Sequence, residues 1–405
     1  MRSFDQWLTA AVCCGACALA GCARTGANAS LAPTAPIIPV PSIPATKAKF
    51  VYTGNQGFSL SGYSVNTSTG SLTVLSGFPL ALSGDTQVVA VDPQNRFLFV
   101  GDTAFSVLHV FAINDSTGAL SQIRESPYAT VHEPVAIAVD PSGTHVYVAS
   151  LGSNSVGGYS VNTRGELTPI AGSPFATSGT KEFGFDVVIN AAGTFVYVED
   201  ISNIYTYRVN AASGALTLLQ TIAGPFQGST IALDPHGTYF YAVGSGSNSI
   251  RAYAINRSSG LLTSASTSPM VKQNGAYTIS ISPTGRFAYT IENNNDLVSY
   301  ALKDGVFTPI GRSYSHIFGQ RIGVDPSGRF LYVPQACGNC SGAAFNVVNE
   351  FSIDGSGALT EIPGSPVAAG TTPLGIAITT QNSPRRSWWR RSWSAFRRWN
   401  LRHGS

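Results

Sequence analysis

The chain has 405 residues, of which 11% are charged and 43% are hydrophobic, and it contains 42 glycines. This composition suits many short strands joined by tight turns, and it excludes an intrinsically disordered chain. Seven arginines lie between Arg385 and Arg402 with no acidic residue among them, so the overall net charge of +3 becomes about −4 for residues 1–384. The body is thus mildly acidic, and nothing in its sequence resembles the footprint of a nucleic-acid-binding protein.

Residues 1–21 predict a signal peptide. The apolar stretch from Trp7 to Ala20 has 14 residues, which is too short to cross a bilayer as a helix and typical of a signal-peptide core. It ends in a Leu-Ala-Gly-Cys sequence at Cys22, which resembles the lipobox of bacterial lipoproteins. We therefore expect an exported protein, held to the bacterial cell envelope by lipid on Cys22, in the periplasm or at the cell surface. A plain cleaved signal peptide is the alternative.

Residues 22–47 predict an extended tether between this anchor and the folded domain. Prolines recur every few residues, at Pro33, Pro36, Pro39, Pro41 and Pro44. Such spacing favours polyproline II conformation, which advances about 3.1 Å per residue. We expect the tether to hold the domain away from the membrane surface.

A single unit repeats along residues 48–380. In each copy an apolar strand ends in an Asp-Pro-x-Gly turn or a close variant, and a second apolar strand follows. In these turns a side-chain oxygen accepts from backbone N–H groups, proline presets φ, and glycine takes the left-handed closing position. The first turn residue recurs every 43–50 residues, at Asp92, Asp140, Asn190, Asp234, Ser282 and Asp325.

A second motif follows each strand pair. Alternating apolar residues lead through a glycine turn into a Gly-x-Leu-Thr sequence or a variant of it, which predicts a third strand, a hairpin and a fourth strand. Copies begin at Tyr63, Phe111, Tyr159, Tyr207, Tyr253, Tyr300 and Phe351. Four antiparallel strands in a repeat of this length are typical of a β-propeller blade.

The two ends of the repeat region each contain part of one blade. Residues 49–53 read as a second strand without a first strand before it, and residues 373–380 read as a first strand with nothing after it. Together they make one blade from both ends of the chain. The sequence therefore predicts an all-β, seven-bladed β-propeller whose ring is closed by N- and C-terminal strands that share a blade.

The repeat resembles that of the bacterial lactonase-like seven-bladed propellers, the group that contains 6-phosphogluconolactonase and the fungal carboxymuconate cycloisomerase. The resemblance covers residues 48–380 and rests on the Asp-Pro-x-Gly turn and the Gly-x-Leu-Thr hairpin. It implies a propeller with a lactone-hydrolysing or isomerising activity. In those enzymes His and Arg side chains stand just before the first strands of several blades, and a Glu stands near the end of a second strand.

This chain differs from the group at those positions. Asn293 stands at the position of the Glu, with Glu292 one residue earlier. Four residues before each turn residue, where the His would stand, it has Val88, Ala136, Asp186, Thr230, Thr278, Arg321 and Gly375. One residue earlier it has Gln87, Val135, Phe185, Ser229, Tyr277, Gln320 and Leu374, none of which is Arg. No catalytic residue of the group is therefore carried over to this chain.

The same positions predict a different polar site at one end of the central channel. Asp186 and Arg321 would face one opening, with amide and aromatic side chains nearby, at Gln87, Phe185, Tyr277 and Gln320. A carboxylate, a guanidinium, amides and aromatics suit a small polar ligand such as a sugar or a carboxylate. Asp186 is also the candidate general base for catalysis, whereas Arg321 can only orient a substrate. The alternative is that these two charges simply neutralise each other.

We expect a propeller that binds a small polar ligand or a protein partner at the channel opening. A lactonase-type hydrolase or isomerase is the first alternative, and a non-catalytic surface scaffold is the second. The His and Cys residues show no metal-ligand spacing, and the chain has no glycine-rich phosphate loop, so we expect neither a metal nor a cofactor. We expect a monomer without a nucleic-acid partner.

The sequence also predicts a local disulfide in one loop and a membrane-binding helix at the C-terminal end. Cys337 and Cys340 lie in a long loop, where an exported protein would form a local disulfide. Beyond residue 380 the composition becomes basic and rich in tryptophan. Large aromatic residues fall on one side of a helix at Trp389, Trp393, Phe396 and Trp399, with arginine on the other sides. This pattern favours a helix lying on an anionic membrane, and an unstructured tail is the alternative.

Overall fold

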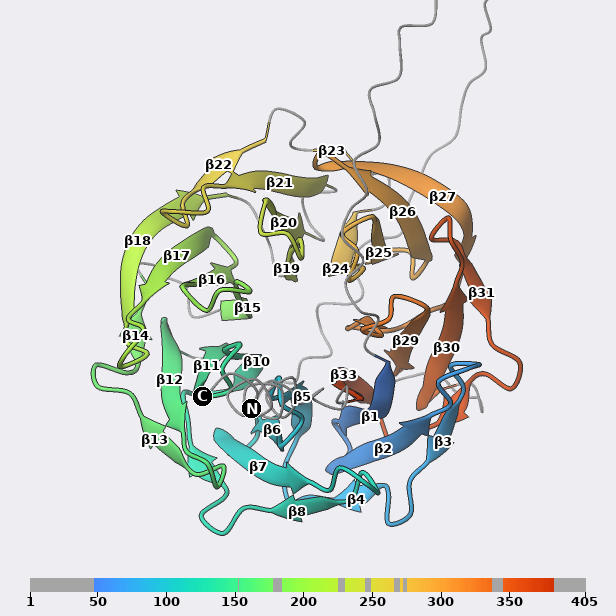
Figure 1. Ribbon diagram of the computed structural model, residues 1–405, viewed down its shortest axis with the longest axis horizontal. Helices are drawn as coiled ribbons and strands as arrows, with labels where there is room; N and C mark the ends of the chain where they lie inside the picture. The colour runs from blue at the N-terminus through green and yellow to red at the C-terminus, as the bar shows by residue number, and fades with distance from the viewer. Residues whose placement is uncertain are drawn as a thin grey trace, which may run out of the picture. The chain divides into compact units, whose positions relative to one another are not determined.

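The computed structural model describes residues 47–151, 153–177, 184–224, 230–244, 249–265, 270–271, 275–336 and 345–381. The regular structure in these ranges is entirely β and forms seven antiparallel sheets arranged in a ring (Figure 1). The predicted seven-bladed β-propeller is therefore confirmed. We number the blades in chain order and count the composite blade as blade 1.

Each blade begins with an inner strand beside the axis of the ring. The inner strands of blades 1 to 7 are β33 (Pro373–Thr380), β5 (Thr86–Val91), β10 (Pro134–Val139), β15 (Gly184–Ile189), β19 (Ile231–Leu233), β24 (Ala276–Ile281) and β28 (Gly323–Val324). Each contacts the inner strand of the next blade, and β28 contacts β33, so the ring closes.

Two further strands follow in every blade. The second strands are β1 (Ala48–Asn55), β6 (Phe97–Asp102), β11 (His145–Ser150), β16 (Phe195–Asp200), β20 (Tyr239–Gly244), β25 (Phe287–Glu292) and β29 (Phe330–Gln335). The third strands are β2 (Ser59–Val65), β7 (Val107–Ile113), β12 (Ser155–Val161), β17 (Asn203–Val209), β21 (Ser249–Ile255), β26 (Leu297–Lys303) and β30 (Val347–Ile353). β1 pairs with both β2 and β33, which confirms the composite blade.

The outer strand differs from the simple four-strand prediction. It is continuous in blades 4 and 6, as β18 (Leu216–Ala223) and β27 (Val306–Tyr314), and divided in the other blades. In the sequence each of these five divisions contains a proline, which has no N–H to donate to the neighbouring strand. The divided strands are β3 (Leu72–Val74) with β4 (Leu80–Ala81), β8 (Leu120–Gln122) with β9 (Tyr128–Ala129), β13 (Leu167–Pro169) with β14 (Phe175–Ala176), β22 (Leu262–Ser264) with β23 (Met270–Val271), and β31 (Leu359–Glu361) with β32 (Val367–Ala368).

The antiparallel pairing gives the ring two different faces. Turns between the first and second strands lie on the same face as the hairpins between the third and outer strands, and we call this the turn face. Loops between the second and third strands and the linkers between blades lie on the opposite face, the linker face. Neighbouring turns contact each other across blades; for example, Arg96 donates to the carbonyl of Gly143 at 3.1 Å.

The Asp-Pro-x-Gly turns form as the sequence predicts. In blade 7, Asp325 Oδ1 accepts from the backbone N–H groups of Arg329 and Phe330, at 2.8 Å each. Gly328 adopts a φ of 70°, and its N–H donates to the carbonyl of Asp325. The carboxylate thus satisfies backbone donors that no strand reaches, and this explains why Asp, Asn or Ser recurs at this position.

The glycine of each outer hairpin joins neighbouring blades. Tyr332 of blade 7 donates its hydroxyl proton to the carbonyl of Gly70 in blade 1 at 2.7 Å, and a Cβ on Gly70 would lie 2.2 Å from the ring of Phe330. Gly70 also has a φ of 82°, which side chains rarely adopt. The same tyrosine-to-glycine bond recurs between other neighbours, at Tyr52–Gly118, Tyr147–Gly214, Tyr197–Gly260 and Tyr289–Gly357.

Candidate functional site

Several candidate residues lie at bulges on the inner strands, whereas Gln320 and Arg321 precede β28. In blades 2, 3, 4 and 6 the register against the second strand shifts by one residue after the first pair. The extra residues are Gln87, Val135, Phe185 and Tyr277. A bulge re-aims the side chains beside it. In these four blades, the positions that the sequence singled out before the first strands are thus the places where the inner strand bends at the linker face.

Asp186 and Arg321 meet across the ring. Arg321 Nη1 lies 3.1 Å from Asp186 Oδ2, and Arg321 Nη2 lies 3.5 Å from the carbonyl oxygen of Val135. Arg321 belongs to blade 7, whereas its two partners belong to blades 4 and 3. Because those blades stand opposite blade 7, the guanidinium reaches the axis of the ring. The Arg321 side chain is 28% exposed, and that of Asp186 is 11% exposed.

Asp186 also accepts a hydrogen bond from the neighbouring blade 5. Its Oδ2 accepts from the N–H of Ile231 at 3.1 Å, and its Oδ1 accepts from the N–H of Val187 at 3.0 Å. Thr230 does the same one blade further on, where its hydroxyl accepts from the N–H of Ile279 at 2.9 Å. Position four before the turn residue is thus a structural acceptor in blades 4 and 5. Both Asp186 oxygens are engaged, which argues for charge pairing and against a free general base.

The other predicted site residues do not join this ion pair. Gln87 donates to Asp85 within its own blade at 2.9 Å. The Tyr277 hydroxyl donates to Asn295 at 3.2 Å, and burial raises the pKa of Tyr277. Gln320 is exposed beside Arg321. The side chain of Phe185 lies outside the described part of the molecule.

The propeller and its axial ion pair can be compared with known proteins. Residues 89–277 and 230–361 match the family described as lactonase, seven-bladed β-propeller, and together these ranges cover more than half of the chain. This chain belongs to the lactonase family. A comparison with curated proteins finds no match.

Several solved structures share the fold of this lactonase-family propeller. A protein of Bacteroides uniformis with a proposed 6-phosphogluconolactonase activity has a TM-score of 0.70 at 16% identity, covering 82% of this chain and 100% of the other. The periplasmic gluconolactonase of Pseudomonas aeruginosa has a TM-score of 0.67 at 18% identity, covering 82% and 98%. A protein of Lactobacillus plantarum has a TM-score of 0.66 at 19% identity, covering 82% and 99%. At these identities the likeness concerns the fold alone.

The lactonase-family propeller also carries an acidic cluster that the motif analysis missed. Asp85 lies in the linker into blade 2 and accepts from Gln87, while Thr103 Oγ1 lies 3.4 Å from the same Gln87 amide. Burial raises the pKa of the Asp85 carboxyl, hydrogen bonds from Gln87, Thr103 and Gln56 oppose that rise, and the nearby Asp102 carboxylate adds to it. An alignment of the repeats would have revealed this position, because most blades have a polar residue at the end of the second strand, where blade 2 has Asp102.

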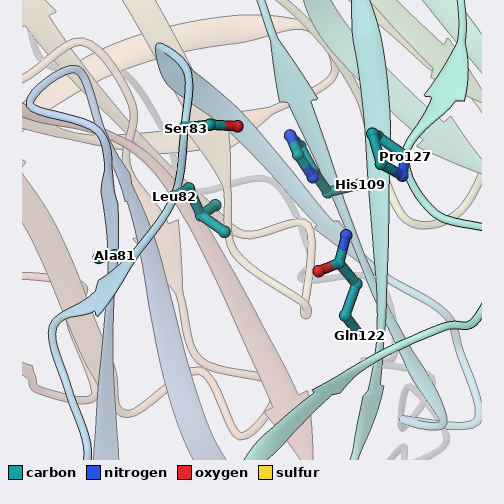
Figure 2. A pocket seen from close by; sticks show the side chains of 6 residues that line it. All are labelled: Ala81, Leu82, Ser83, His109, Gln122 and Pro127. Carbon is teal, nitrogen blue, oxygen red and sulfur yellow. The ribbon is translucent and has the colours of Figure 1, made fainter.

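A buried His–Asp pair lies beside this cluster. His109 Nε2 is 3.4 Å from Asp102 Oδ2, and His109 Nδ1 is buried without a hydrogen-bond partner. The histidine lines a shallow pocket of about 420 Å³, with Ser83 and Gln122 directed toward the same space in Figure 2. The remaining lining residues are Ala81, Leu82 and Pro127.

The His–Asp pair has counterparts in other blades, which explains its presence. A residue at the end of the second strand bonds to the third strand in the pairs Asn55–Ser61, Asp200–Tyr205 and Gln335–Asn349. These contacts secure the linker between blades. In blade 2 the linker residue Gly84 passes so close that a Cβ there would overlap the carboxylate of Asp102. The His109–Asp102 pair therefore has a structural role, like its counterparts in the other blades.

Several predicted sites fall outside the described residues. They are the lipidation site Cys22, the pair Cys337 and Cys340, and the tail residues Trp389, Trp393, Phe396 and Trp399. Within the described ranges, no helix has the length and hydrophobicity that a membrane span requires. Those same ranges also bring no three His, Cys, Asp or Glu side chains into a metal-binding group.

Proposed function

We propose that this lactonase-family propeller binds a neutral polyhydroxylated molecule, a sugar or sugar lactone, at the ring axis on its linker face, with Arg321 as the anchoring residue. The observation that carries the proposal is the position of the Arg321 guanidinium at the axis with its side chain 28% exposed. A guanidinium has five N–H donors, and the contacts to Asp186 and Val135 use two of them. The others can donate to a ligand oxygen.

The charge of the linker face selects a neutral ligand over an anion. Carboxylates dominate that face, and they repel anions while accepting hydrogen bonds from ligand hydroxyl groups. Asp85, Glu133 and Asp296 are partly exposed, and the others, Asp102, Asp186, Glu199, Asp200 and Glu292, are buried beneath them. A lactone or sugar thus suits the site better than a sugar acid, because its carbonyl or ring oxygen accepts from Arg321 and its hydroxyls face carboxylates.

Calorimetric titration tests this proposal. Stable sugars and D-gluconolactam, which mimics a lactone without hydrolysing, are expected to bind the parent protein at least tenfold more tightly than gluconate. Arg321→Ala is expected to weaken that binding by about 10- to 100-fold, the effect of removing a charged hydrogen-bond donor. Arg124→Ala is the matched control, because Arg124 is highly exposed and lies away from the axis. A parent protein that binds no member of the panel would indicate a scaffold instead.

Lactone hydrolysis is the second candidate function, and family membership favours it. Asp186 would then have to act as the general base, although both of its oxygens already accept hydrogen bonds. We expect D-glucono-1,5-lactone to open in the presence of the protein no faster than it does spontaneously. Turnover above that background, lost in Asp186→Asn, would move the function from binding to catalysis.

We also propose that the protein is exported and lipid-anchored. The Leu-Ala-Gly-Cys sequence ending at Cys22 supports this, as does the periplasmic location of one structural relative. Metabolic labelling with palmitate is expected to mark the parent protein and to be absent from a Cys22→Ala variant. Labelling that persists in the variant would show that lipid is attached elsewhere.

A further inference from the structure

Basic side chains are concentrated on the turn face. Those at or next to its turns and hairpins are Lys47, Lys49, Arg96, Arg164, Arg208, Arg257, Arg286, Lys303 and Arg329. By contrast, the arginines toward the linker face in the described ranges are Arg321, which is paired with Asp186, the partly buried Arg251 near the start of β21, and Arg312 near the end of β27. The two faces of the ring therefore differ in charge.

The acidic side chains on the turn face offset this charge only in part. The turn carboxylates of Asp92, Asp140, Asp234 and Asp325 are buried and accept hydrogen bonds from their own turns. Ion pairs join Asp92 to Arg96, Asp115 to Lys49 and Glu166 to Arg164, whereas Asp304 and Asp354 are exposed. Among the exposed charged side chains of this face, the basic ones therefore outnumber the acidic ones.

Both ends of the folded domain also lie on the turn face. The N–H of Gln381 donates to the carbonyl of Lys47 at 2.6 Å, and Ala48 pairs with Thr380. The sequence that carries Cys22 and the arginine- and tryptophan-rich sequence after residue 384 are therefore both joined to the ring at this face. The points where these two segments join the domain therefore lie on the face that carries the basic side chains.

We propose that the turn face is a docking surface for an anionic phospholipid bilayer, with the linker face and Arg321 directed away from the membrane. Phospholipid phosphates attract the exposed basic groups, while the carboxylates of the linker face oppose the reverse orientation. The inference builds on the proposed envelope location. It does not depend on what Arg321 binds.

Vesicle co-sedimentation with matched charge variants tests the docking surface. The protein is the mature chain, residues 22–405, with Cys22→Ser so that lipid does not fix it to the bilayer. Arg257→Gln/Arg286→Gln removes two exposed charges from the turn face, and Arg124→Gln/Arg312→Gln removes two from the rim of the ring. The pairs match in kind, because Arg286 stacks on Phe287 and Arg312 stacks on Tyr314.

On vesicles of phosphatidylcholine with phosphatidylglycerol, the turn-face variant is expected to bind at least tenfold more weakly than the parent. Each basic group near an anionic surface contributes about fivefold. The rim variant is expected to change less than twofold, and 0.5 M salt is expected to release the parent. Equal losses in both variants, or equal binding to vesicles of phosphatidylcholine alone, would overturn the proposal.

Hydrogen exchange on the Cys22→Ser protein gives a second readout that needs no charge variant. Anionic vesicles are expected to protect amides in the hairpins of the turn face, such as residues 114–119 and 256–261, and to leave the loop at residues 103–106 unchanged. Protection of the linker-face loop would contradict the orientation. Because ligand binding at Arg321 is measured in solution, failure here would leave the proposed function standing.

Discussion

Replacing Gly70 by alanine is expected to lower the free energy of unfolding by about 2–4 kcal/mol. Two effects combine at this position. The φ of 82° places a Cβ in a disfavoured conformation, and that Cβ would lie 2.2 Å from the ring of Phe330 in the next blade. Because Gly70 belongs to blade 1 and Phe330 to blade 7, the loss falls on the contact that closes the ring.

Gly77→Ala is the matched control for this measurement. Gly77 lies in the same blade at a nearly identical φ of 84°, but a Cβ there meets nothing within 4 Å. Its replacement is expected to cost only the backbone strain, about 1 kcal/mol. Equilibrium urea unfolding of both variants separates strain from blade packing. Equal losses would show that the contact between Gly70 and Phe330 contributes nothing to ring closure.

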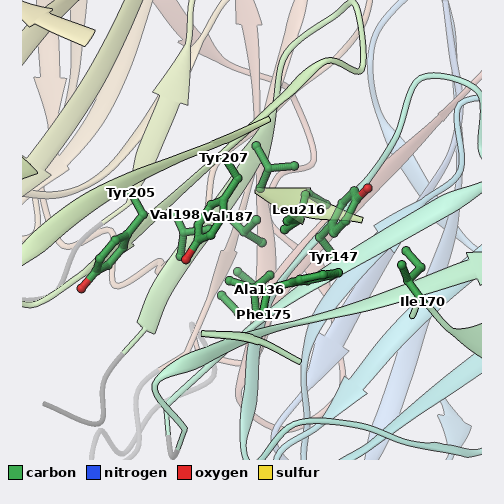
Figure 3. Close-up of a cluster of buried hydrophobic side chains, with 13 residues drawn as sticks. Ala136, Tyr147, Ile170, Phe175, Val187, Val198, Tyr205, Tyr207 and Leu216 are labelled. Atoms are coloured by element: carbon green, nitrogen blue, oxygen red, sulfur yellow. The ribbon is translucent and has the colours of Figure 1, made fainter. Parts of the chain in front are cut away.

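Asp186→Ala is expected to lower the free energy of unfolding by about 3 kcal/mol. The substitution leaves the N–H of Ile231 without its acceptor and removes the charge that pairs with Arg321. The lost acceptor lies between blades 4 and 5, whereas the next residue, Val187, packs with Tyr147 and Tyr207 between blades 3 and 4 (Figure 3).

Thr230→Ala separates these two contributions. It removes the equivalent acceptor from the N–H of Ile279, without any charge, and is expected to cost about 1–2 kcal/mol. The difference from Asp186→Ala reports the ion pair. A double-mutant cycle with Arg321→Ala measures that pair directly, and we expect a coupling energy of about 1 kcal/mol because Arg321 is partly solvated. A coupling energy near zero would show that Asp186 serves only the backbone.

Local signals were sufficient to predict the propeller. The turn residues, such as Asp325, act through hydrogen bonds to residues four and five positions away, so their chemistry is visible in a short stretch of sequence. The closing strand at residues 373–380 was recognisable because an inner strand without a successor needs a partner at the other end of the chain. The divided outer strands were missed, since a proline interrupts pairing with a strand whose register the sequence does not specify.

The candidate site was only partly predictable. Alignment of the repeats placed Asp186 and Arg321 at equivalent positions, and the structure brings them together. The same alignment suggested that Gln87 and Tyr277 would join them, whereas each bonds within its own blade. The direction of a side chain beside a bulge depends on the register between two strands, and no single position in the sequence reveals that register.

The most direct test of the central claim is a crystal structure of the protein with D-gluconolactam bound. We predict that the ligand lies at the ring axis on the linker face, with an oxygen within hydrogen-bond distance of the Arg321 guanidinium and with Asp186 still accepting from the N–H of Ile231. Ligand bound instead in the pocket beside His109, or an empty axis at saturating ligand concentration, would contradict the account.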